Sequence, residues 1–317
     1  PDCCVLTSGA TFSLNLLLQG LLREGGHVVV SQMEHNSVLR PLSLLQNVEI
    51  SRIPCSEDGS LNPGELAPLL RPNTRAVCVT HASNVCGTLL PVAQIGQICR
   101  REGVPFVVDA SQTAGHVPID MNAMNIDGLA IPGHKGLLGP QGIGAALMTR
   151  ALARALPPLV AGGTGSHSSS EIQPEELPDK FESGTQNLPG VYGLLSAIRF
   201  VGPRMEALHT REMGLCSRLL DGLCALAGVR LLGTRDLSRR VAVVAADFPA
   251  LDNASVADRL ARDYGIFTRC GLHCAPGAHQ ALGSYPQGTV RFSIGWKNNE
   301  EEIDRCVAAV REITAKP

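Results

Sequence analysis

The first residue with the chemistry of a reactive group is a lysine set among glycines, in Gly133-His134-Lys135-Gly136. It follows an apolar run, and the small neighbours bring its side chain close to the backbone. We expect Lys135 to be poorly solvated, and desolvation lowers the pKa of an amine and makes it nucleophilic. A lysine on an ordinary surface loop is the alternative interpretation of the same residues.

An acidic residue ends another apolar run, in Val107-Val108-Asp109. The carboxyl end of a buried strand is where α/β folds bind their ligands. A carboxylate is the expected partner of a protonated pyridine nitrogen, such as that of pyridoxal 5'-phosphate. Asp is also a favourable helix N-cap, so capping is an alternative role. Because Asp109 and Lys135 end consecutive predicted strands, each strengthens the functional interpretation of the other.

Glycine and hydroxyl residues precede the first predicted helix, in Thr7-Ser8-Gly9-Ala10-Thr11. The free N–H groups and the dipole of a helix N-terminus attract anions, so this segment is a candidate phosphate site. An ordinary capped helix start is the alternative.

Two further polar residues follow predicted strands. His35 has a flat imidazole that can stack on a pyridine ring or move protons, although a structural histidine is the simpler explanation. Asn84, in His81-Ala82-Ser83-Asn84, can donate a hydrogen bond to a ring hydroxyl.

Short β-branched runs alternate with helical patterns along the first 200 residues, which predicts an α/β fold with a mostly parallel, buried sheet. The expected strands are 28–30, 48–53, 76–80, 105–109, 128–131 and 143–148. The expected helices are 10–23, 36–46, 64–70 and 92–102. A loop rich in Gly, Ser and Pro is expected at 161–178.

The last third of the chain predicts a smaller α+β domain, so the expected domains are residues 1–200 and 201–317. Helical patterns run over 188–226 with a break at Gly202-Pro203, and also over 255–263 and 299–314. Strands are expected at 241–248 and 288–294.

Composition excludes several classes of protein. The 317 residues carry a formal net charge of −2 and 3% aromatics, so we expect neither a nucleic-acid nor a membrane partner. No apolar run approaches the ~18 residues that cross a bilayer. Eleven cysteines, an odd number in a long chain, favour a reducing, cytoplasmic setting over a disulfide framework. The chain starts at Pro1 without Met, so we expect a processed or truncated amino end.

The order of these motifs resembles the cysteine desulfurases of the class V aminotransferase family, which have the pyridoxal phosphate (PLP) fold-type I architecture. The resemblance covers essentially the whole chain. The motifs that carry it are Ser-Gly-Ala-Thr (8–11), Glu-His-Asn (34–36), His-Ala-Ser-Asn-Val-Cys-Gly-Thr (81–88), Val-Asp-Ala-Ser-Gln (108–112), Gly-His-Lys (133–135), Phe-Glu-Ser-Gly-Thr-Gln-Asn (181–187), Arg-Cys-Gly-Leu-His-Cys-Ala-Pro (269–276) and Val-Arg-Phe-Ser-Ile-Gly (290–295).

The resemblance implies a role for each matched residue around the cofactor. Lys135 holds PLP as a Schiff base, Asp109 pairs with the pyridine nitrogen, and His35 stacks on the ring. The residues implied near the ring oxygen are Gln112 and Asn84. Those implied around the phosphate are Gly9, Ala10, Thr11 and His134, with Thr185 reaching the phosphate of the neighbouring subunit in a homodimer.

The resemblance also implies how L-cysteine is processed. Arg291, together with Asn84, binds the substrate carboxylate. Cys274 is the nucleophile that takes the sulfur, becomes a persulfide and leaves L-alanine, after which a sulfur-acceptor protein is a possible partner. Arg269 and His273 are expected to favour the thiolate.

The chain departs from the family pattern in places. Pro132 stands where a Ser is common and Ala10 where a Thr is common, so we expect one phosphate contact to be lost at each position. Family members also commonly extend several dozen residues further at the amino end. These departures favour an alternative of another class, a non-catalytic relative that folds without turnover.

Two rival interpretations concern the chemistry of the site itself. A selenocysteine lyase acting on L-selenocysteine, or a related aminotransferase, is the nearest enzymatic rival, although Cys274 disfavours a plain aminotransferase. Cys270, His273, Cys274 and His279 have a spacing that suggests zinc, but without paired Cys-x-x-Cys motifs we expect no metal.

Overall fold

The computed structural model describes residues 3–315, which form two compact units. The first unit comprises the chain up to Ile53, Asn62–His81 and Pro91–Pro203. The second comprises Pro54–Leu61, Ala82–Leu90 and the chain from Arg204 onward. The domains expected from the sequence are contiguous, whereas the second unit takes two short segments from the first half of the chain.

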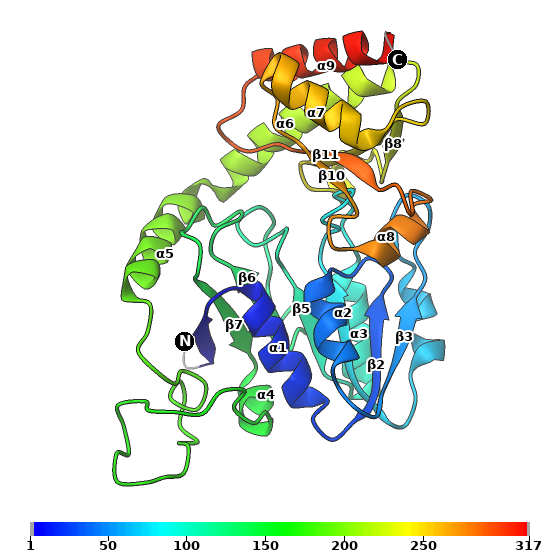
Figure 1. Ribbon diagram of the computed structural model, residues 1–317. Helices are drawn as coiled ribbons and strands as arrows, with labels where there is room; N and C mark the ends of the chain where they lie inside the picture. The colour runs from blue at the N-terminus through cyan, green and yellow to red at the C-terminus, as the bar shows by residue number, and fades with distance from the viewer. Residues whose placement is uncertain (1–2, 316–317) are drawn as a thin grey trace. The chain divides into compact units, whose positions relative to one another are not determined.

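The first unit is built on a seven-stranded sheet (Figure 1). The strands are, in spatial order, β1 (Cys4–Thr7), β7 (Gly144–Met148), β6 (Gly128–Pro132), β5 (Phe106–Asp109), β4 (Thr74–Thr80), β2 (Gly26–Ser31) and β3 (Val48–Ile53). The pairs from β6 to β3 are parallel, whereas β7 runs antiparallel to both β6 and β1. The predicted mostly parallel sheet is therefore confirmed.

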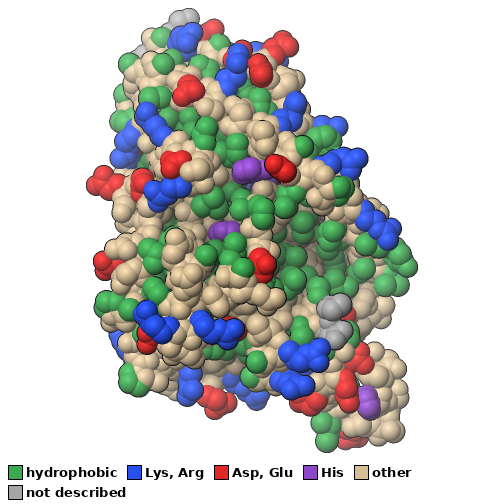
Figure 2. All heavy atoms as spheres, turned by 180° about the vertical axis from the view of Figure 1, so that it is seen from behind, with side chains coloured by type: hydrophobic (Ala, Val, Ile, Leu, Met, Phe, Trp, Pro, Cys, Tyr) green, Lys and Arg blue, Asp and Glu red, His purple; other side chains and the backbone are tan. Residues whose placement is uncertain are grey.

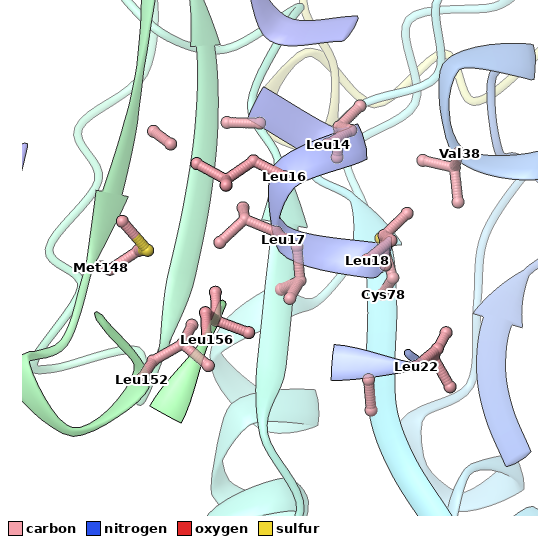
Figure 3. Close-up of a cluster of buried hydrophobic side chains, with 14 of the residues drawn as sticks. Leu14, Leu16, Leu17, Leu18, Leu22, Val38, Cys78, Met148, Leu152 and Leu156 are labelled. Carbon is pink, nitrogen blue, oxygen red and sulfur yellow. The ribbon is translucent and has the colours of Figure 1, made fainter. Parts of the chain in front are cut away.

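Helices cover both faces of this sheet. They are α1 (Ala10–Leu21), α2 (Asn36–Ser43), α3 (Val92–Glu102) and α4 (Arg150–Ala155), and the same unit also contains α5 (Leu188–Val201). Alternate residues of each central strand face opposite sides, so β2 buries Val28 and Val30 against the α1 side while Val29 is buried on the other. Figure 3 shows the leucines of α1 pointing into the cluster with Cys78 of β4 and Met148 of β7. Burial on both faces explains why these strands read as continuous apolar runs.

The second unit contains a four-stranded antiparallel sheet. Its strands are, in spatial order, β10 (Arg269–Gly271), β11 (Thr289–Ser293), β9 (Val243–Asp247) and β8 (Arg230–Leu232). Its helices are α6 (Met205–Cys224), α7 (Asn253–Tyr264), α8 (Pro276–Ala281) and α9 (Glu300–Ala315). A second hydrophobic core joins α6, α7 and α9 to the sheet, so this unit has the α+β character that the sequence predicted.

One expected helix is wrong. Residues 64–70 form two short 3₁₀ turns, Pro63–Glu65 and Ala67–Leu69. Pro68 has no N–H to donate and Gly64 costs helix stability, so an α-helix is disfavoured there. Five short elements of three to six residues each were not predicted from the sequence, namely β1, β8, β10, α4 and α8. Such short elements carry too little periodicity to detect.

Candidate functional site

Most of the predicted cofactor residues lie at one edge of the first unit's sheet. The parallel strands β2, β4, β5 and β6 end at the same edge. β1 also ends there, because it is antiparallel to β7, which is antiparallel to β6. The residues that follow or end these strands are Gly9, Ala10, Thr11, His35, Asp109, Gln112, His134 and Lys135. The expectation that Asp109 and Lys135 follow consecutive strands is correct.

The N-terminus of α1 is open at this edge. Gly9 is the N-cap residue with φ 145°, a conformation that favours glycine, and within residues 3–315 no side chain caps the helix there. A Cβ built on Gly9 would meet no described atom within 4 Å. Helix N-terminal N–H groups without a side-chain acceptor suit an anion.

A chain of hydroxyl contacts joins α1 to His35. Thr11 Oγ1 lies 2.8 Å from Ser37 Oγ, which lies 2.9 Å from His35 Nδ1. His35 is the N-cap of α2, and its Nδ1 accepts a hydrogen bond from the Ser37 N–H at 3.0 Å. Because Nδ1 accepts that bond, the proton of a neutral imidazole belongs on Nε2. These contacts fix the plane of the ring.

Asp109 is buried at the end of β5 and is 3% exposed. Its Oδ1 accepts a hydrogen bond from the Ser111 N–H at 2.9 Å. The residues that follow form turns, so the alternative role as a helix N-cap is wrong, although the carboxylate does stabilise the turn. A buried carboxylate at a strand end can meet a cationic ligand atom.

The Lys135 loop is shaped by close backbone packing. Leu138 N donates to Lys135 O at 2.8 Å, and Gly139 N donates to Gly133 O at 2.7 Å. A Cβ on Gly115 would lie 2.3 Å from the carbonyl oxygen of Gly136, so the segment after Asp109 presses against the lysine loop. Lys135 itself is exposed, which corrects the expectation that it is poorly solvated. The glycines position the lysine and do not enclose it.

Two buried polar residues at this edge were not predicted from the sequence. Glu34, which precedes His35, is fully buried, and desolvation raises its pKa to about 8. Desolvation lowers the pKa of His81, directly after β4, to about 4, and its Nδ1 is buried without a hydrogen-bond partner in the described structure. Both belong to motifs named above, but only their burial marks them as unusual.

Two other positions singled out in the sequence, Pro132 and Thr185, differ from each other in burial. Pro132 is the buried last residue of β6, where it supplies neither a hydroxyl nor an N–H. Thr185 is exposed in the loop before α5, next to Gly184, whose N–H donates to Gly163 O at 2.8 Å.

The predicted nucleophile lies in the second unit. Cys274 is exposed in the turn between β10 and α8. It has φ 57°, and His273 before it has φ 49°, so two consecutive residues with Cβ atoms adopt the left-handed conformation. This conformation is costly for such residues and is common at functional sites.

Asn84 and Arg291 belong to the same unit and hold this turn. Asn84 Nδ2 donates to His273 O at 2.8 Å, and Arg291 Nη1 donates to Asn84 O at 3.1 Å. Arg291 is paired across the antiparallel strands with Arg269. Desolvation, together with the charge of Arg269, lowers the pKa of Arg291, so two guanidinium groups share a site that an anion would stabilise.

The histidines near Cys274 do not support the predicted role of His273. Desolvation lowers the pKa of His273 to about 3, helped by the charges of Arg291, His279 and Arg269. His273 is therefore neutral near pH 7 and supplies no positive charge to a thiolate, which corrects that expectation. His279 is also buried, with its pKa lowered to about 4 by desolvation, and its ring lies 5.6 Å from that of His273.

The described residues 3–315 contain no group of three or more His, Cys, Asp or Glu side chains that could hold a metal ion. All eleven cysteines belong to this part of the chain and are free thiols. No helix within it is both long enough and apolar enough to cross a membrane.

A sheet of this order, with a lysine loop, a buried aspartate and an open helix N-terminus at its carboxyl edge, defines an α/β protein of PLP fold type I. Solved structures agree. An apo cysteine desulfurase from Thermococcus onnurineus matches with a TM-score of 0.92 and 31% identity, over 100% of this chain and 80% of that one. The cysteine desulfurase CsdA from Escherichia coli matches with a TM-score of 0.89 and 28% identity, over 98% and 78%.

The chain belongs to the aminotransferase class-V family, whose model matches residues 2–306. A probable cysteine desulfurase from Xylella fastidiosa is 35% identical over 98% of this chain and 75% of its own length. A cysteine desulfurase from Escherichia coli is 32% identical over 98% and 77%. The predicted family is therefore confirmed, and it is a family of PLP-dependent enzymes.

Proposed function

We propose that this protein is a PLP-dependent cysteine desulfurase that converts L-cysteine to L-alanine and leaves a persulfide on Cys274. The observation that carries the proposal is the strand-edge arrangement of Gly9, Asp109 and Lys135 in a chain whose relatives are named cysteine desulfurases. The exposed thiol of Cys274 favours this reaction over a plain transamination, which needs no thiol.

The residues present fit the cofactor. The open N-terminus of α1 and Thr11 suit its phosphate, the buried Asp109 carboxylate suits its pyridine nitrogen, and the exposed Lys135 amine can bind its aldehyde carbon. The remaining proposed contacts are His35 on the ring, Gln112 and Asn84 near the ring oxygen, and Ala10 and His134 near the phosphate. When bound, PLP supplies an electron sink for the substrate α-carbon.

The chain's own residues then have separate tasks. We assign the substrate carboxylate to the guanidinium of Arg291 and the α-proton to the amine of Lys135. The Cys274 thiolate attacks the substrate sulfur, so an S–S bond forms and the C–S bond breaks. The electron pair of the C–S bond stays with the carbon, which takes up a proton and leaves as alanine. A thiol of an acceptor protein can then remove the outer sulfur from Cys274.

The assembly we propose is a homodimer in which Thr185 reaches the partner's phosphate site. Exposed apolar residues repeat along one face of α5, at Leu188, Tyr192, Leu195 and Ile198. Figure 2 shows hydrophobic side chains gathered on the flank of the first unit where Figure 1 places α5. Thr185 lies three residues before this helix, so the same surface would bring it near the partner. Sedimentation velocity that shows a monomer at all concentrations would contradict the dimer.

The compartment we propose is the cytoplasm, because free thiols favour a reducing environment.

The test uses three single variants with PLP and L-cysteine. We expect Lys135→Ala to lose the visible absorption of the bound cofactor and both products. Cys274→Ala should keep that absorption and lose sulfide release, while Cys270→Ala, a matched exposed thiol, should keep both. The measurements are the absorption spectrum, alanine and sulfide, with selenide measured in parallel from L-selenocysteine.

Each rival has its own outcome. A protein that stays colourless with PLP is the non-catalytic relative. Turnover of L-selenocysteine alone identifies a selenocysteine lyase, and sulfide release that survives Cys274→Ala removes Cys274 from the mechanism.

A further inference from the structure

Glu34 has a carboxyl group that the proposed mechanism does not use. The side chain is fully buried at the end of β2. Its Oε1 accepts hydrogen bonds from Ser31 Oγ at 2.5 Å and from Thr80 N at 2.8 Å. Its Oε2 is buried and, among the described residues, has no hydrogen-bond partner. Oε1 therefore accepts two hydrogen bonds, whereas Oε2 accepts none from the described residues.

This arrangement suits a protonated acid. An ionised carboxylate would leave a charged oxygen buried without a donor, which costs far more than an unpaired neutral O–H. Ser31 Oγ accepts from Met33 N at 3.1 Å, so its own proton points to Glu34.

Two titratable groups face Glu34, Asp109 on β5 and Cys78 on β4. The charge of Asp109 opposes the ionisation of Glu34, whereas the buried Cys78 thiol, whose pKa is raised well above its ordinary value, stays neutral. Desolvation is the main cause of the raised Glu34 pKa, and the charge of Asp109 adds to it against the opposing hydrogen bonds of Ser31 and Thr80. Glu34 and Asp109 likewise add to the effect of burial in raising the pKa of the Cys78 thiol. A second carboxylate beside Asp109 would thus be unfavourable for the whole group.

The two bonds to Oε1 join strand ends that carry predicted cofactor residues. Ser31 is the last residue of β2, and His35 follows it by four positions. Thr80 is the last residue of β4 and is paired in register with Asp109 on β5. Through one oxygen, Glu34 connects the strand that leads to His35 with the strand beside Asp109.

We propose that Glu34 is a positioning residue that acts as a neutral carboxylic acid, tying the ends of β2 and β4 together without placing a second negative charge beside Asp109. Its relevance to catalysis rests on the proposed function, since His35 and Asp109 are the residues it aligns for the cofactor.

The protonation is tested on the protein without PLP, by comparing wild type with Glu34→Gln. The folded state of the wild type retains a proton that an unfolded glutamate, with its ordinary pKa near 4.5, has released. Stability due to Glu34 is therefore complete below about pH 4.5 and is lost as pH rises toward about 8. The denaturation midpoint of the wild type should fall relative to that of Glu34→Gln over this range, because glutamine does not ionise.

A matched control is Glu24→Gln, because the Glu24 side chain is 88% exposed. The denaturation midpoint of this variant should change with pH in parallel with that of the wild type. The infrared carbonyl band of a protonated carboxyl should be present in the wild type at pH 7 and absent in Glu34→Gln. Parallel midpoints for wild type and Glu34→Gln, or no protonated band, would overturn the neutral acid.

The positioning role is tested by hydrogen exchange at the Thr80 amide. Glu34→Ala removes the acceptor, so exchange of this amide should accelerate at least about tenfold, whereas Glu34→Gln keeps an acceptor oxygen and should retain protection. Equal loss of protection in both variants would overturn the proposal, and so would unchanged protection in Glu34→Ala. If Glu34→Ala does not fold, the test rests on Glu34→Gln at pH 7. The proposal requires this variant to keep both the protection of the Thr80 amide and the stability of the folded protein, and loss of either would overturn it.

None of these measurements requires turnover. Failure of the enzyme to release sulfide would contradict the proposed function and leave the Glu34 result standing. Conversely, an ionised Glu34 in an active desulfurase would contradict only the proposal about Glu34.

Discussion

The two units hold their candidate chemical groups on different kinds of structure. In the first unit, Asp109 ends a buried parallel strand and Lys135 follows the next one. In the second, Cys274 follows the three-residue strand β10 in a turn with left-handed backbone. Strand ends in a buried sheet are rigid, whereas a turn beyond a short edge strand has fewer supporting contacts. The difference suits the proposed function, in which the cofactor is held in one place and the Cys274 thiol meets first the substrate and then an acceptor.

The buried ionisable groups beside the candidate residues also differ between the two units. The first unit buries the acids Glu34 and Asp109 at its site edge, and the second buries the guanidinium of Arg240 and much of Arg291. Away from these positions each unit also buries the opposite charge, with Lys180 in the first and Glu212 and Asp247 in the second. Buried acids suit a cationic ring nitrogen, whereas buried guanidinium groups suit a carboxylate substrate or carbonyl oxygens. At these positions the first unit therefore suits the ring nitrogen of the proposed cofactor, and the second suits the carboxylate of the proposed substrate.

The largest effect is expected where the rigid edge of the first unit is most tightly packed. Gly115→Ala places a Cβ 2.3 Å from the Gly136 carbonyl oxygen, at a residue with φ 89°. We expect a loss of about 4 kcal/mol in the free energy of unfolding, measured by urea denaturation. Gly163→Ala, where a Cβ meets no described atom within 4 Å, is the matched control and should be nearly neutral. Equal stability of the two variants would show that the lysine loop is not held by this contact.

A slightly smaller effect is expected from the buried cation of the second unit. Arg240 donates to the carbonyl oxygens of Val243 at 2.7 Å and Cys86 at 3.2 Å, and also to that of Thr234. Arg240→Met keeps much of the length of the side chain and leaves these carbonyls unpaired, so we expect a loss of about 3 kcal/mol in urea denaturation. The exposed neighbour provides the control, since Arg239→Met should cost under about 1 kcal/mol. If the two variants cost the same, burial of Arg240 does not stabilise this unit.

The smallest effect concerns one buried histidine in each unit. Desolvation lowers the pKa of both His81 and His279 to about 4. An unfolded histidine protonates near its ordinary pKa of 6.5, so the stability each contributes is present above pH 6.5 and is lost as the pH falls toward 4. We expect roughly 2 kcal/mol for each between pH 7 and pH 4.5, measured by denaturation across pH. His81→Asn and His279→Asn should each flatten the dependence of the free energy of unfolding on pH, whereas the control His167→Asn, at an exposed histidine, should not. If neither buried variant changes the dependence on pH, other groups cause the loss of stability in acid.

The sequence predicted more of the first unit than of the second. Six of the seven strands of the first sheet were expected, and α3 was expected at its observed bounds, Val92–Glu102, because long apolar runs and helical periodicity are strong local signals. In the second unit the three-residue strands β8 and β10 were not expected. A strand that short has no detectable period, and only its pairing with β9 or β11 defines it.

The site follows the same division. The order of motifs identified the family and the candidate residues, because residue types at fixed positions in the chain are local information. Only the tertiary structure decided that Lys135 is exposed, that His273 is neutral, that one buried oxygen of Glu34 has no hydrogen-bond partner among the described residues, and that Asn84 belongs to the unit of Arg291. Solvation and protonation depend on neighbours distant in sequence, such as Asp109 beside Glu34, and no local pattern contains that contact.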